Sequence, residues 1–139
     1  MTAAPSRLAL IAVAALGAIN LVRGSIHFFA PDGGAASIAG LDIAPAPQTI
    51  LFLFASLGAG QIGMGLADAA AALRWRSFVT PLLFIHTAQT ALGVFALFVL
   101  KPPPVQVPGQ WFNLGLLVVL AAIAALEALK KPCPVDLYT

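Results

Sequence analysis

Residues 77–100, SFVTPLLFIHTAQTALGVFALFVL, contain no Lys, Arg, Asp or Glu. A hydrocarbon core of about 30 Å is crossed by roughly 20 apolar residues in an α-helix, and a helix satisfies its own backbone there. Three further stretches, 8–22, 43–67 and 102–126, share this lack of charge. The sequence therefore predicts an all-α fold, an integral membrane bundle of four helices.

Composition agrees with this fold class. The chain has 139 residues, of which 60% are hydrophobic and 9% charged, whereas a typical soluble domain has about 25% charged residues. A single cysteine excludes an internal disulfide framework. The chain has seven basic and five acidic residues, so it lacks the density of positive charge that binds nucleic acid. The length allows one transmembrane domain, 1–139.

Helix-breaking residues delimit the four predicted spans, which run over about 7–29, 49–73, 77–100 and 110–130. The breakers between and after them are Pro31, Gly33, Gly34, Pro45, Pro47, Pro102, Pro103, Pro104, Pro108, Gly109 and Pro132. A signal peptide is the alternative for the first span, but its apolar run continues to Phe29, which favours retention.

The basic residues predict the orientation of the spans. One side of the predicted bundle carries Arg7, Arg74, Arg76, Lys130 and Lys131, and the other carries Arg23 and Lys101. Because basic loop residues are enriched on the cytoplasmic side, we expect both termini to be cytoplasmic. Cys133 then lies in the cytoplasmic tail, most simply as a free thiol.

Polar residues inside the spans are functional candidates, because they are costly in a bilayer. They are Asn20, Arg23, His27, Gln61, Asp68, His86 and Gln89. A rise of 1.5 Å per residue places Asn20, Gln61 and Gln89 near the midplane, where they could form a hydrogen-bonded layer. Asp68 and His86 come close enough to pair below this layer, and the first-span pair Arg23 and His27 lies above it.

These residues have two interpretations that the sequence leaves open. Asn, Gln and His often only tie membrane helices together, or they form a ligand or proton site. Arg23 either snorkels to the interface or pairs with Asp32, Asp42 or carbonyls of the outer loop. The two histidines lie some 15 Å apart along the membrane normal, which argues against one shared haem. No cluster of ligands has metal spacing, and no catalytic residues can be named.

Four glycines crowd the second span: Gly58, Gly60, Gly63 and Gly65. The pairs Ser56/Gly60 and Ala59/Gly63 have the small-xxx-small spacing that lets helix backbones approach closely, within one chain or between protomers. The alternative is a glycine-lined surface against a flat ligand such as a quinone.

The outer loop, 30–48, is long for a helix-to-helix connection, and loops of this length are often functional. Asp32 can cap a short surface helix that begins at Gly33, with Ile38 and Leu41 on its apolar side. We expect this helix to cover Arg23 and His27 as a lid, or to be a surface cap with no ligand beneath it.

The layout resembles the small four-span bacterial inner-membrane proteins of the DoxX-like kind. The shared features are an Arg-Gly late in the first span, a glycine-rich second span and the basic turn Arg74-Trp75-Arg76. Some members of that group are linked to quinone-coupled sulfur oxidation or to membrane redox complexes. The resemblance implies the bacterial inner membrane and carries no catalytic residue.

Three functions remain on this sequence. The first is an accessory or scaffold subunit of a membrane complex, without catalytic activity. The second is a redox protein that binds a quinone or another hydrophobic small molecule through the polar residues of the first three spans. The third is a small transporter or channel, which would have to oligomerise. We expect a lipid bilayer as the environment, a homo-oligomer or a larger complex as the assembly, and either no cofactor or a quinone.

Overall fold

The computed structural model describes residues 4–103, 106 and 109–130. This part of the chain has four helices long and apolar enough to cross a membrane, and no strand. They comprise α1 (Arg7–Phe29), α2 (Pro47–Leu73), α3 (Val79–Phe95), preceded by η1 (Arg76–Phe78) and followed by the π-helical turn η2 (Ala96–Leu100), and α4 (Gln110–Ala128). The predicted all-α fold is confirmed, with helix ends within about two residues of the predicted spans.

Local chemistry explains where the helices begin. Ser6 caps α1, because its Oγ accepts a hydrogen bond of 3.0 Å from the Ala9 amide. Pro47 opens α2, where the missing N–H costs nothing. Gly109 precedes α4 with a φ of +85°, a left-handed conformation that favours glycine. The third and fourth spans are thus separated by residues that cannot continue a helix.

Helices α1 and α2 form a close antiparallel hairpin through four glycines, two on each helix and seven residues apart. On α1 they are Gly17 and Gly24, and on α2 they are Gly58 and Gly65. A Cβ added to Gly58 would lie 2.8 Å from the Gly24 carbonyl oxygen, so the two backbones touch there. Gly60 and Gly63 have no atom within 4 Å of an added Cβ. Of the four glycines predicted to allow close approach, Gly58 and Gly65 therefore form the contact with α1 in the described structure, whereas the pairs Ser56/Gly60 and Ala59/Gly63 do not.

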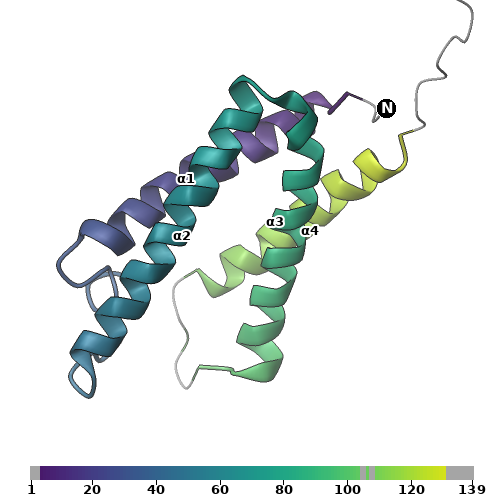
Figure 1. Cartoon of the computed structure of the whole chain (residues 1–139). Helices are drawn as coiled ribbons and strands as arrows, with labels where there is room; N and C mark the ends of the chain where they lie inside the picture. The colour runs from purple at the N-terminus through teal and green to yellow at the C-terminus, as the bar shows by residue number, and fades with distance from the viewer. Residues whose placement is uncertain (1–3, 104–105, 107–108, 131–139) are drawn as a thin grey trace, which may run out of the picture.

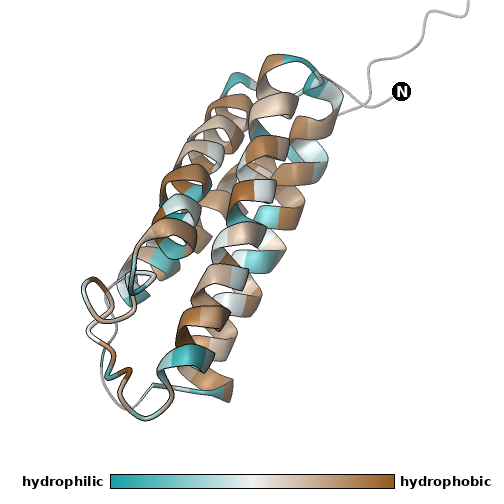
Figure 2. Ribbon diagram, turned by 60° about the vertical axis from the view of Figure 1, so that its left-hand side comes forward, coloured by the Kyte–Doolittle hydropathy of each residue, from teal (hydrophilic) through white to brown (hydrophobic). Residues whose placement is uncertain are grey.

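The apolar core lies at one end of the bundle. Its buried members come from all four helices and are Ala9, Val13, Leu16, Ala71, Val79, Leu83, Leu120 and Ala124. Figure 1 shows that the α1/α2 and α3/α4 hairpins meet near the start of α1 and diverge toward the other end. We call these the convergent end and the open end. Apolar residues occur along the whole length of the helices (Figure 2), and many of their large side chains are exposed.

Residues 31–39 of the outer loop form hydrogen-bonded turns rather than the predicted surface helix. Asp32 does act as a cap, since its carboxylate accepts hydrogen bonds from the Gly34 and Ser37 amides at 2.9 and 2.7 Å. Gly33 and Gly34, however, have φ values of +60° and +76°. Consecutive left-handed residues are incompatible with a right-handed helix, so the chain turns back over the end of α1.

Candidate functional site

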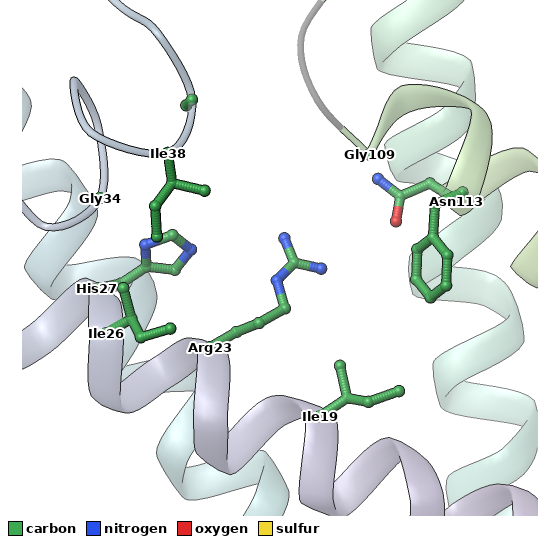
Figure 3. Close-up of a pocket in the computed structure, with 10 residues that line it drawn as sticks. Ile19, Arg23, Ile26, His27, Gly34, Ile38, Gly109 and Asn113 are labelled. Atoms are coloured by element: carbon green, nitrogen blue, oxygen red, sulfur yellow. The ribbon is translucent and has the colours of Figure 1, made fainter.

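A cavity of about 410 Å³ lies at the open end, between α1, the outer loop and the start of α4. We call it the open-end cavity. Its lining comprises Ile19, Arg23, Ile26, His27, Gly34, Ile38, Ala39, Gly109, Phe112 and Asn113. Figure 3 shows the Arg23 and His27 side chains extending from α1 into this space, with Asn113 facing them from α4. Two predicted site residues are therefore brought to one cavity, partly covered by the predicted loop.

His27 is held in one orientation and one tautomer. Its Nδ1 lies 2.7 Å from the Gly33 carbonyl oxygen, and because a carbonyl only accepts, Nδ1 carries the proton and donates. The ring also meets Phe54 edge to face, with centroids 5.2 Å apart. In the neutral imidazole Nε2 then has a free lone pair and acts as a hydrogen-bond acceptor. The loop thus sets the chemistry that His27 offers to the cavity.

Arg23 forms no hydrogen bond or ion pair with any described residue, and its side chain is exposed. The predicted partners are engaged elsewhere: Asp42 accepts from the Ala44 amide at 3.0 Å, and Asp32 caps the loop. The backbone hydrogen bonds from Ser37 and Gly34 lower the pKa of the Asp32 carboxyl to about 2. Nearby backbone amides satisfy both carboxylates, so of the two alternatives for Arg23 the pairing is not formed among the described residues, and the exposed side chain fits the snorkelling alternative.

Asn113 completes the polar part of this cavity, and the sequence reasoning did not assign it to a site. The sequence feature that could have indicated a role for Asn113 is its setting, an amide near the end of a predicted span that consists mostly of Leu, Val, Ile and Ala. Most other lining residues are apolar, namely the three isoleucines and Phe112. A guanidinium, an imidazole acceptor and a carboxamide therefore converge on a largely apolar space, which is typical of sites for amphiphilic small molecules.

The three predicted midplane residues Asn20, Gln61 and Gln89 line a second pocket of about 320 Å³, together with Ser56, Leu57, Gly60 and Met64. We call it the amide pocket. The three amides do lie together, as their equal predicted depth indicated, but no hydrogen bond joins them in the described structure. Gln61 Oε1 is buried and has no hydrogen-bond partner among the described residues. The predicted hydrogen-bonded layer is not formed, because α3 diverges from α1 and α2 at this level (Figure 1).

Asp68 and His86 form a buried pair between α2 and α3. The imidazole Nε2 lies 2.8 Å from Asp68 Oδ1 and 2.9 Å from Oδ2, and both residues are buried. Gly17 of α1 packs against the Asp68 side chain, since a Cβ there would come within 2.8 Å of Asp68 Cβ. The pairing predicted from depth is confirmed, and it joins the two hairpins near the convergent end.

A third buried polar residue, Glu127, was not predicted to have a role. Its carboxylate accepts hydrogen bonds from the Ser6 amide at 3.2 and 3.4 Å and from Lys130 Nζ at 2.9 Å. The N-terminal end of a helix favours a negative charge, so Glu127 stabilises the start of α1 from α4. The available signal was that α1 begins and α4 ends on the same predicted side of the membrane.

No group of three His, Cys, Asp or Glu side chains in the described residues could hold a metal ion. Comparisons of the chain with protein-family models, with curated proteins and with solved structures found no match.

Proposed function

We propose that this protein binds a hydrophobic small molecule with a hydrogen-bonding head group in the open-end cavity, and that the ligand is of the quinone class. The observation that carries the proposal is that two polar groups line one cavity of about 410 Å³. They are the Arg23 guanidinium, which has no partner among the described residues, and the His27 imidazole, which the Gly33 carbonyl orients. Ligand pockets are typically about 300–1,000 Å³ and mostly apolar with a few placed polar groups.

The lining chemistry matches a flat ring that carries two oxygens. Arg23 donates hydrogen bonds to a carbonyl or phenolate oxygen, and the Asn113 carboxamide donates or accepts. His27 Nε2 accepts from a hydroxyl, whereas Ile19, Ile26 and Phe112 offer apolar contacts to the ring and its tail.

We further propose that both termini lie in the cytoplasm and that the protein resides in a bacterial inner membrane. The convergent end supports this topology, because its described residues include the four basic residues Arg7, Arg74, Arg76 and Lys130, whereas the open end has Arg23 and Lys101. The open-end cavity then faces the outer leaflet, from which a lipid-soluble ligand would enter.

Ligand binding can be followed by the fluorescence of Trp111, which lies next to the lining residue Phe112 and 5.6 Å from the Phe98 ring. The chain has two tryptophans, so a Trp75→Phe variant leaves Trp111 as its one tryptophan. Titration of the detergent-purified protein with a short-tailed benzoquinone should quench it saturably. A hydrogen bond to a charged group contributes about 1.5–3 kcal/mol, so Arg23→Leu should weaken binding about 10-fold to 100-fold.

Two variants make this test specific. His27→Asn retains an amide nitrogen that can replace Nδ1 toward Gly33 but removes Nε2, so it should weaken binding and leave the melting temperature nearly unchanged. Lys101→Gln removes a positive charge at the open end but outside the cavity lining. The affinity of this variant for the benzoquinone should equal that of the parent protein. Equal affinities for Arg23→Leu and Lys101→Gln would refute the site.

An accessory or scaffold subunit is the second candidate function. What favours it is the surface beside the amide pocket, where Gly60 and Gly63 leave open space and Gln89 is exposed within a spanning helix. A partner helix could approach these glycines closely and pair with the amide. Site-specific photocrosslinking from position 63 in the native membrane should then capture a defined partner, and a position on α4 such as Val118 provides the lipid-facing control.

A further inference from the structure

The turn between α2 and α3 carries a third pocket, at the convergent end and distinct from the open-end cavity. This turn pocket has a volume of about 260 Å³, and its lining is apolar: Ala67, Ala70, Ala71, Trp75, Phe78 and Leu82. Trp75 and Phe78 are both exposed, so the pocket is accessible from the protein surface. Helix α2 ends at Leu73 and η1 begins at Arg76, which puts the pocket at the level where a spanning segment meets the head groups.

Two arginines bracket Trp75 in this turn. Arg74 is the C-terminal cap of α2, where its amide donates to the Ala70 carbonyl oxygen at 2.8 Å, and Arg76 opens η1. Both side chains are exposed, and neither forms a hydrogen bond or ion pair with a described residue. The acids near this end that the structure describes are already engaged: Glu127 by Lys130 and the Ser6 amide, and Asp68 by His86. The turn therefore presents two positive charges without a described protein counter-charge.

We propose that this turn is a specific site for an anionic phospholipid, with an acyl chain in the turn pocket and the phosphate against Arg74 and Arg76. Guanidinium groups match phosphate geometry through paired N–H donors, and basic pockets between spanning helices bind anionic head groups. The apolar pocket distinguishes this ligand from a soluble anion, because phosphate alone would leave the lining unused. This site is independent of the ligand proposed for the open-end cavity.

The fluorescence of Trp75 tests the site directly in a Trp111→Phe background of the full chain. Phosphatidylglycerol with brominated acyl chains should quench Trp75, because a bound chain comes into contact with the indole. A basic residue near an anionic surface strengthens binding about five-fold, so two should favour phosphatidylglycerol over brominated phosphatidylcholine by about 30-fold. The double variant Arg74→Gln/Arg76→Gln should lose this preference.

Matched variants separate the site from the general charge of the convergent end. Arg7→Gln also removes an exposed basic residue at this end, and it should retain most of the preference. Ala67→Leu fills the turn pocket from an exposed position and should reduce quenching while both arginines remain. Equal quenching by the two lipids would overturn the proposal, as would an equal loss in Arg7→Gln. Displacement of the lipid by an equimolar amount of inorganic phosphate would identify an anion site instead.

Discussion

The close contact of α1 and α2 makes a quantitative prediction about two neighbouring glycines of α2. A Cβ at position 58 would lie 2.8 Å from both the Gly24 carbonyl oxygen and the Phe28 amide nitrogen, whereas ordinary contact begins at 3.4 Å. These atoms are backbone and cannot rotate away, so the helices must separate by several tenths of an ångström. At Gly60 an added Cβ meets nothing within 4 Å.

The free energy of unfolding should therefore differ between Gly58→Ala and Gly60→Ala. Both substitutions gain about 1 kcal/mol of helix propensity, so this contribution cancels in the comparison. Overpacking costs about 1–3 kcal/mol, and that is the predicted deficit of Gly58→Ala relative to Gly60→Ala. Gly60→Ala itself should be as stable as the parent or slightly more stable.

Equilibrium unfolding in one mixed detergent system, with helicity followed by circular dichroism, measures both variants under the same conditions. Gly24→Ala provides an independent replicate on the partner helix, because its Cβ would meet the Gly58 carbonyl oxygen at 2.8 Å. If Gly58→Ala and Gly60→Ala unfold at the same denaturant concentration, the α1/α2 packing described above is incorrect. Gly58 also contacts the backbone at His27, so Gly58→Ala should weaken ligand binding in the open-end cavity as well.

Three further predictions concern the buried and capping carboxylates. Asp68→Leu leaves a buried His86 nitrogen without its hydrogen-bond partner and should lower the unfolding free energy by about 1–3 kcal/mol, and adding His86→Phe should restore much of this loss. A double variant no more stable than the single one in the same unfolding assay would contradict the pair. Glu127→Leu should lower the unfolding free energy by about 1.5–3 kcal/mol, with Glu127→Gln between it and the parent, because Gln still accepts from Ser6. Asp32, with its pKa lowered to about 2, should stabilise the loop above pH 3.8 and lose this contribution as the pH falls toward 2. The protection factor of the Gly34 amide, which is its exchange rate relative to the intrinsic rate at the same pH, should fall over this range, and Asp32→Asn should remove that change.

Local properties of the sequence were sufficient to predict the spans and one of the buried pairs. The bilayer thickness fixes how many uncharged residues a span needs. Clusters of Pro and Gly lie between the spans, so the helix ends agree with the predicted ones within about two residues. Depth is also local, because each residue adds a constant rise. Counting from the helix ends therefore placed Asp68 and His86 together.

Arrangements that depend on the angle between helices could not be predicted in this way. The glycine pattern of α2 contains two sets of small residues, and only the crossing with α1 selects Gly58 and Gly65 rather than Gly60 and Gly63. Equal depth placed the three amides in one pocket, but divergence of the hairpins left them without mutual hydrogen bonds. Depth is thus a necessary condition for a contact in a bundle and not a sufficient one.

The sequence by itself determined that the chain forms four spanning helices and which polar residues lie within them, because hydrophobic length and helix breaking act along the chain. Only the tertiary structure decided which of those residues meet. It turned the loop back through left-handed Gly33 and Gly34, fixed the His27 tautomer through the Gly33 carbonyl and opened the cavity at Arg23. The physical reason is that side-chain contacts depend on how whole helices cross and where a loop returns, and packing sets both over distances that no sequence window spans.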